Sequence, residues 1–336
     1  MLLEGLHIPL TTPFFADGRL NLRKLEQNVQ HYSLTPAAGM IVLGENGEPP
    51  LLSETETVDA LKTALAAAAD AKVMLAGVAR NSLRSILELM EEAARIGYDA
   101  VALAPPALPG LTPDELRTLL QMAADRSPLP VVLTGNLPSD LVCALALHPQ
   151  IIGYLGAIGA AEIRSLRERT AVVQRKIVVT HVFAPVTGRM AARSTGLVSP
   201  ESLSGGVVVA APPARPALRT REKMVSFQIL TARSESLMDA LEAGAVGVAP
   251  PLAAAAPQAC YEVYAAWKDG DLPLSAEKQL RLEGSIQLIE EELGVRGVKY
   301  GCDRNGYYGG APRLPLLPLT GPQRAAVEQA LLNLRG

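Results

Sequence analysis

The chain has little cysteine, few aromatic residues and no strong excess of either charge. Its three cysteines, Cys143, Cys260 and Cys302, are far apart and lack metal-ligand spacing, so we expect reduced thiols in a cytoplasmic protein rather than a disulfide framework. The net charge of −3 offers no basic surface for nucleic acid or for an anionic membrane. The first fifteen residues contain no basic region and no long apolar run, so we expect neither a signal peptide nor a membrane helix.

Short apolar runs alternate with stretches of helical periodicity through most of the chain. The predicted strands are Leu6–Leu10, Met40–Leu43, Val73–Val78, Ala100–Leu103, Val131–Thr134, Ile151–Leu155, Phe227–Leu230 and Ala245–Val248. The predicted helices between them are 21–32, 54–70, 81–96, 112–125, 139–147, 159–172 and 234–243. Strict alternation of eight such units is typical of a (β/α)8 TIM barrel, predicted here over residues 1–256. Further helices at 257–268, 275–293 and 322–334 predict a C-terminal helical region, 257–336.

One segment, residues 177–224, interrupts the alternation between the sixth helix and the seventh strand. It contains two strand-like runs, Ile177–Phe183 and Val207–Ala210, which predict partial order, such as a small hairpin. An alternative register would make Ile177–Phe183 the seventh barrel strand. We prefer Phe227–Leu230, because residues 236–244 then supply a seventh helix. We expect the insertion to cover the barrel mouth or a subunit contact, since its apolar side chains would otherwise be exposed.

Several motifs, in order along the chain, resemble the dihydrodipicolinate synthase / N-acetylneuraminate lyase family. The matching segments are 9–14 with Asp17-Gly18, 44–48 with Leu51, Leu52 and Glu54, 104–106, 136–138, 243–248, Lys299, and 313–316. The resemblance covers nearly the whole chain except the insertion. It implies a (β/α)8 barrel with a C-terminal helical domain, usually assembled as a tetramer.

The resemblance also implies Schiff-base chemistry, which this sequence lacks the residues to perform. In the family, a lysine at the end of strand six attacks a keto acid, a tyrosine after strand five moves protons, and two threonines hold the substrate carboxylate. Here the lysine position is Leu155, the tyrosine position is Thr134, and the threonine pair is Glu45 and Asn46. The family's second tyrosine, from the loop after strand four of a neighbouring subunit, is also missing, because residues 104–110 contain no tyrosine.

None of the eight lysines is predicted to replace the missing amine, because active sites of this fold lie at the C-terminal ends of the strands. Lys72 precedes strand three, and the others fall on outer helices, beside the insertion or beyond the barrel. We therefore expect a family member that is not catalytic as an aldolase and that binds a small polar ligand or a paralogue. The alternative is a lyase that acts on a small keto acid or related compound without lysine.

The expected ligand-binding residues are Glu45, Asn46, Thr134, Asn136 and Leu155, and no catalytic residue is assigned. Glu45 would disfavour a carboxylate ligand and favour a cationic or hydroxyl-rich one, or else it is a solvated loop residue. Thr134 and Asn136 could bind a ligand, but a turn explains Thr-Gly-Asn equally well. Glu48 is expected to hold its loop to nearby backbone amides. We expect no metal, no cofactor and no nucleic-acid or membrane partner, and a homo-oligomer, either dimer or tetramer.

Overall fold

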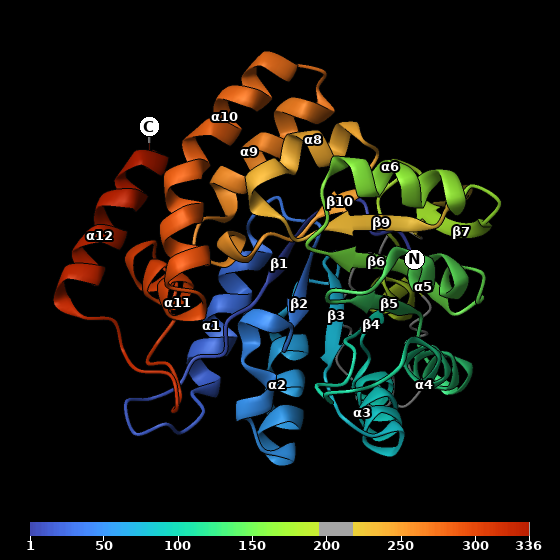
Figure 1. Cartoon of the computed structure of the whole chain (residues 1–336), viewed down its shortest axis with the longest axis horizontal. Coiled ribbons are helices and arrows are strands. Elements are labelled where there is room, and N and C mark those ends of the chain that lie inside the picture. Colours follow the sequence, from blue (N-terminus) through green and yellow to red (C-terminus); the bar gives the residue numbers. More distant parts are fainter. Residues whose placement is uncertain (195–217, 336) are drawn as a thin grey trace, which may run out of the picture.

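The computed structural model describes residues 1–194 and 218–335, in which eight parallel strands close into a barrel (Figure 1). Around the barrel the strands follow the order β1-β10-β9-β6-β5-β4-β3-β2. The barrel strands are β1 (Gly5–Pro9), β2 (Gly39–Val42), β3 (Val73–Val78), β4 (Ala100–Leu103), β5 (Val131–Thr134), β6 (Ile151–Gly156), β9 (Gln228–Thr231) and β10 (Gly247–Val248). Each predicted strand overlaps one of these, so the predicted (β/α)8 barrel is confirmed.

Helices on the outside of the barrel return the chain from each strand to the next. They are α1 (Leu22–Ser33), α2 (Glu54–Ala67), α3 (Leu83–Ile96), α4 (Pro113–Arg126), α5 (Ser139–Ala146), α6 (Ala160–Arg169) and α8 (Leu237–Glu242). Local sequence sets where they begin. Ser53 and Thr112 cap α2 and α4, and each forms a capping box with the glutamate three residues later.

The side chains of the strands divide into two apolar layers. Alternate residues pack outward against the helices, and Tyr154 belongs to this outer layer. The inner layer is formed by strand residues, including Ile41, Leu75, Ala102, Val132, Leu155 and Leu230. The barrel interior is therefore a packed core and not a channel, as is usual for this fold.

The described part of the insertion forms a separate antiparallel sheet of β7 (Gln174–Thr180) and β8 (Thr220–Ser226). The run Ile177–Phe183 therefore contributes to this sheet, and the alternative that made it the seventh barrel strand is wrong. Its partner strand is 220–226 rather than the predicted run Val207–Ala210, which lies outside the described residues. The sheet begins at Gln174, three residues before the predicted start of the insertion.

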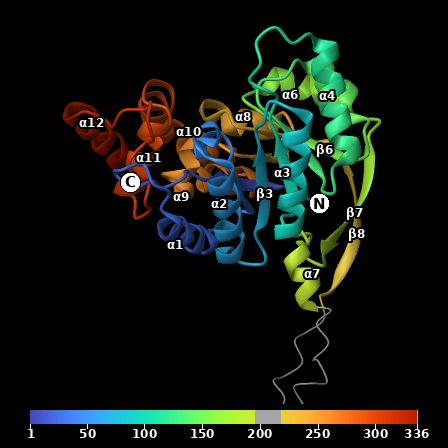
Figure 2. The ribbon, with the colours of Figure 1, turned by 90° about the horizontal axis from the view of Figure 1, so that it is seen from below.

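The insertion lies at the N-terminal ends of the barrel strands (Figure 2). At the first residue of α7 (Gly188–Ser194), the Gly188 amide donates to Asp99 Oδ1 at 2.9 Å. The hydroxyl of Thr187, the residue before this helix, donates to the Asp70 carbonyl. Asp99 and Asp70 precede β4 and β3. The prediction that the insertion covers the barrel mouth is thus wrong for its described residues, and the alternative, a subunit contact, stays a prediction. The chain leaves α6 at the N-terminal face, and these hydrogen bonds anchor it there.

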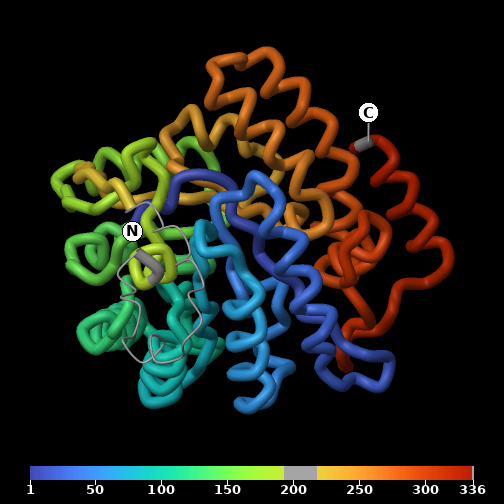
Figure 3. The backbone as a smooth tube through the Cα atoms, turned by 180° about the vertical axis from the view of Figure 1, so that it is seen from behind, coloured from blue at the N-terminus to red at the C-terminus, as the bar shows by residue number. Residues whose placement is uncertain are grey.

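The first residues of the chain enter the barrel from the same face. The Leu3 amide donates to Gln228 Oε1 at 2.7 Å, and Gln228 Nε2 donates to the Met1 carbonyl at 3.0 Å. Leu3 is fully buried in the inner layer, whereas Leu2 packs against Ile177 and Val179 of β7. Figures 2 and 3 both show the N-terminus beside the insertion. The β7–β8 sheet therefore covers the segment that closes the N-terminal end of the barrel.

The C-terminal region packs as helices beside the barrel (Figure 1). They are α9 (Pro257–Lys268), α10 (Leu272–Ser285), α11 (Val295–Arg304) and α12 (Gly321–Leu332), with a π-helical segment at Ile286–Glu292. The predicted helix 275–293 was wrong at its start, because Asp271 caps α10 by accepting from the Leu274 amide. Sequence patterns missed α11, whose Gly297 and Gly301 lower helix propensity but permit close packing, since a Cβ at Gly301 would lie 2.8 Å from Ala255 Cβ. In the described residues, no helix is both long and apolar enough to cross a bilayer.

Candidate functional site

Leu155 lies near the C-terminal end of β6, at the face where barrels of this kind carry their active sites. It pairs in register with Thr134 of β5 on one side and Leu230 of β9 on the other. Its side chain is 8% exposed and belongs to the apolar inner layer. The structure therefore brings Leu155 and Thr134 together on neighbouring strands at the mouth.

The loop after β2 presents one of its two predicted ligand residues to solvent and buries the other. Glu45 opens a short 3-10 turn, Glu45–Gly47, and is exposed. Asn46 is buried, and its Nδ2 donates to the Pro9 carbonyl at 3.1 Å and to the Pro251 carbonyl at 3.0 Å. The Asn46 amide nitrogen thus joins the ends of the first and last barrel strands, which leaves Glu45 as the open group of this loop.

Glu48 anchors the same loop to the C-terminal region through a buried ion pair. Its Oε1 accepts a hydrogen bond from Lys299 Nζ, and its Oε2 lies 3.4 Å from the Arg313 amide. The two side chains of the pair are 1% and 3% exposed. Burial lowers the pKa of Lys299, and the Glu48 carboxylate opposes this shift. Glu48 does hold the loop, as expected, but its main partner is a lysine 251 residues away.

A second ion pair continues this network toward α2. The Arg313 guanidinium donates to both carboxylate oxygens of Glu56, at 2.6 and 2.8 Å, and this bidentate bond lowers the pKa of Glu56 to about 2. The Phe14 ring contacts both cations, with its centroid 4.5 Å from Lys299 Nζ and 4.1 Å from Arg313 Cζ. The network therefore joins the loop after β1, the loop after β2, α2 and the C-terminal region.

Lys299→Met should lower the free energy of unfolding by about 3–5 kcal/mol, because it leaves the Glu48 carboxylate buried without a counter-charge. Urea denaturation measures this change. The matched control is Arg84→Gln, which breaks the exposed Arg84–Glu88 pair and should change stability by less than about 1 kcal/mol. Equal effects of the two substitutions would contradict the role assigned to the buried pair.

The loop after β5 is built around Gly135, whose φ of +84° lies in the left-handed region. Thr134 before it is half-buried, and Asn136 after it is exposed. The Tyr154 hydroxyl donates to the Gly135 carbonyl at 2.9 Å and lies 3.4 Å from the Leu137 amide. Tyr154 thus supports this turn from the outer layer of the barrel, and Asn136 does not join Leu155 in the interior.

Comparisons with known proteins agree with this geometry. The profile of the Dihydrodipicolinate synthetase family matches residues 2–195 and 215–334. The chain belongs to this family. It is 24% identical to a 4-hydroxy-tetrahydrodipicolinate synthase of Acidiphilium cryptum (strain JF-5), with 98% of both chains aligned. It is 23% identical to an L-threo-3-deoxy-hexylosonate aldolase of Aspergillus niger, over 97% of this chain and 93% of that one.

Solved structures of the same family share the fold. A prophage protein of the dihydrodipicolinic acid synthase family from E. coli K12, in complex with pyruvate, superposes with a TM-score of 0.77 at 21% identity, over 100% of this chain and 99% of that one. The dihydrodipicolinate synthase of Acinetobacter baumannii, also complexed with pyruvate, gives a TM-score of 0.78 at 21% identity, over 99% of each chain. These likenesses establish the barrel and its C-terminal helical part for this family member.

A half-buried carboxylate near the mouth, Glu290, was not found from the sequence. It accepts hydrogen bonds from the Ser234 hydroxyl at 2.6 Å and from the Leu252 amide at 2.5 Å, in the segments that follow β9 and β10. Burial raises its pKa to about 7, and the nearby carboxylates of Glu235 and Glu291 add to this shift. A run of three glutamates indicates a solvated helix face, but Glu290, at the start of that run, is half-buried in the π-helical segment.

The contribution of Glu290 to stability should fall as pH rises from about 4.5 to about 7, because the folded state keeps the Glu290 proton after the unfolded chain has lost it. A shift of this size corresponds to about 3 kcal/mol. Glu290→Gln cannot ionise, so the stability of wild type relative to this variant should decline by that order across the interval. Urea unfolding from pH 4 to 8 tests this, with exposed Glu283→Gln of α10 as control; parallel profiles for wild type and Glu290→Gln would refute it.

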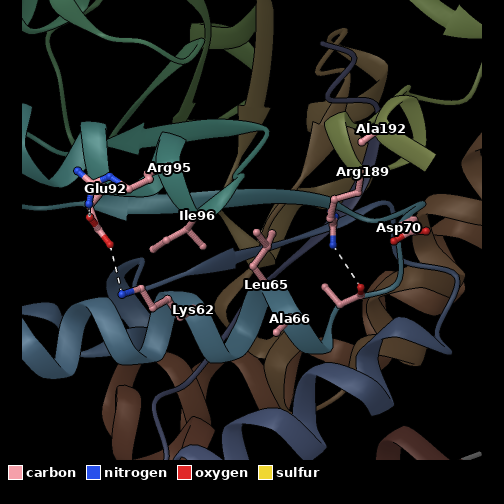
Figure 4. Close-up of a pocket in the computed structure, with 10 residues that line it drawn as sticks. Lys62, Leu65, Ala66, Asp70, Glu92, Arg95, Ile96, Arg189 and Ala192 are labelled. Atoms are coloured by element: carbon pink, nitrogen blue, oxygen red, sulfur yellow. Dashed lines mark hydrogen bonds and ion pairs between the residues drawn. The ribbon is translucent and has the colours of Figure 1, made fainter. Parts of the chain in front are cut away.

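A groove of about 650 Å³ between α2, α3 and α7 contains none of the predicted site residues (Figure 4). Its floor is apolar, formed by Leu65 and Ile96, and at one end Lys62 pairs with Glu92 at 3.5 Å. It lies beside the insertion, at the face opposite the mouth. Within the described part of the chain, no cluster of three or more His, Cys, Asp and Glu side chains is arranged to hold a metal.

Proposed function

We propose that this protein is a member of the family that has lost Schiff-base chemistry and uses its barrel mouth to bind a small polar ligand or a catalytic paralogue. The observation that carries the proposal is Leu155. An imine requires a nucleophilic amine at the reacting carbon, and an isobutyl side chain has no such group. Leu155 packs with Leu230 and Val132 in the inner layer, where it extends the apolar core.

The positions of the lysines support the same proposal. All eight lie within the described residues, and each nitrogen has a hydrogen-bond or ion-pair partner. The partners are Gln27 for Lys24, Glu92 for Lys62, two carbonyls for Lys72, Glu222 for Lys176, Glu4 for Lys223 and Lys268, Glu262 for Lys278, and Glu48 for Lys299. Lys299 is the lysine whose partner belongs to a mouth loop, and its nitrogen is held there by Glu48 and by the Ala311 carbonyl.

The groups on the loops at the mouth also favour a ligand other than a keto acid. The exposed Glu45 carboxylate places a negative charge where the family has neutral donors, and like charges repel. Thr134 offers a hydroxyl beside Leu155, and Asn136 offers an amide at the surface. These groups favour a cationic or hydroxyl-rich ligand. The Asn46 amide nitrogen is already engaged, so we assign Asn46 to shaping the loop rather than to the ligand.

The second candidate is a lyase that works without lysine. Glu45 favours it, as an exposed carboxylate at the face where this fold carries its catalytic groups. In either case we propose a cytoplasmic homo-oligomer, dimer or tetramer, that requires no cofactor. Turnover of a keto acid that is abolished by Glu45→Gln, with no borohydride-trapped adduct, would favour the lyase over the binding protein.

The protein should form no imine with pyruvate, because Leu155 has no amine and each lysine nitrogen is engaged by another group. Incubation with pyruvate and borohydride, followed by intact-protein mass spectrometry, measures this directly. A family member with lysine at this position on strand six serves as the positive control. A reduced pyruvyl adduct mapped to any lysine of this chain would overturn the proposal.

Leu155→Lys alone should not restore aldol turnover, although its amine could be trapped. The apolar surroundings should lower the pKa of the new lysine and leave part of it unprotonated. Proton transfer at Thr134 and carboxylate binding at Glu45 would still be missing. Steady-state retro-aldol and condensation assays test this, with the Leu155→Met variant as a control for packing. Measurable turnover by the lysine variant would show that the other losses are unimportant.

A further inference from the structure

A pocket of about 400 Å³ lies between α6 and the base of the β7–β8 sheet. Arg164 and Arg167 of α6 line one side, and Gln174 and Ser226, the first register pair of the sheet, line the other. The buried ring of Phe227 also contributes to the lining. We call this the α6 pocket. It lies at the N-terminal face of the barrel, away from Leu155.

The fold holds the Arg167 guanidinium over this pocket. Its Nη1 donates to the Ala243 carbonyl at 3.3 Å, and the guanidinium lies directly against Gly244. Any side chain at Gly244 would occupy the space of the guanidinium. The φ of Gly244, +98°, independently favours glycine at this position. Arg167 is exposed, and its contacts with Ala243 and Gly244 place its guanidinium beside the α8–β10 junction.

The pocket carries positive charge that the described residues do not neutralise. Neighbouring cations are paired, Arg169 with Asp140 and Lys176 with Glu222, both at 2.7 Å. For Arg164 and Arg167, the described part of the chain supplies no carboxylate within ion-pair distance. Glu168 lines the pocket too, so two arginines and one glutamate leave a net charge of +1.

We propose that the α6 pocket binds a small molecule that bears a phosphate group. Two arginines three residues apart on one helix project to the same side and can share the oxygens of a tetrahedral dianion, which guanidinium groups bind with paired hydrogen bonds. The Ser226 hydroxyl, on the opposite wall, offers a further donor. A volume of about 400 Å³ accommodates a phosphate together with a small organic part.

Calorimetric titration with inorganic phosphate at constant ionic strength tests the proposal on the full-length protein. Wild type should show saturable binding with a dissociation constant on the order of 1 mM or tighter. Arg164→Gln/Arg167→Gln should weaken binding by about tenfold or more, because two charge-assisted interactions are lost. Arg84→Gln, which removes an arginine on α3, should bind as wild type does. Glu168→Gln should bind phosphate more tightly, since it removes the opposing charge.

Circular dichroism shows whether the double variant is folded, and Arg164→Lys/Arg167→Lys provides a second, more conservative test. The lysine variant keeps both charges but loses the paired geometry, so it should bind more weakly than wild type and more tightly than the glutamine variant. Absence of saturable phosphate binding by wild type, or equal affinity in wild type and the folded double variant, would overturn the proposal. Neither result depends on the chemistry at Leu155.

Discussion

The buried ion pair between Glu48 and Lys299 connects the barrel mouth to the C-terminal region. Two opposite charges removed from water stabilise a fold only when both are present, so the pair fixes the loop after β2 against α11. With that loop in place, the Asn46 side chain donates to the carbonyls of Pro9, at the end of β1, and Pro251, which follows β10. Glu45 then remains exposed on the same loop. The same pair holds the amine of Lys299 against the Glu48 carboxylate.

The interior of the barrel shows that the fold does not depend on an amine at the end of β6. The strands close through backbone hydrogen bonds and an apolar inner layer, and a leucine at the end of β6 contributes to that layer at least as well as a lysine would. Stability therefore does not require the catalytic amine. Similarity across nearly the whole chain establishes the family, whereas the reaction depends on a few side chains at the mouth.

The two ends of the barrel differ in how they are built. The mouth is shaped by short loops, with Glu290 and Asn46 holding the segments that follow the last strands. The opposite end is closed by the first residues of the chain, and the β7–β8 sheet covers them. Because this sheet also forms a wall of the α6 pocket, the insertion adds a second potential binding surface remote from the mouth.

The sequence alone determined the barrel, because the alternation of buried strands and amphipathic helices follows from local hydrophobic periodicity. It also placed Leu155 and Thr134 at the ends of two barrel strands, because a short buried run between helical segments shows where each strand ends. It could not place the insertion, whose location depends on contacts with Asp99 and Asp70 far away in the sequence. Nor could the sequence show that Lys299 pairs with Glu48 or that Glu290 points inward. Burial and long-range partners determine the protonation state of a charged group, and they arise only when the chain has folded.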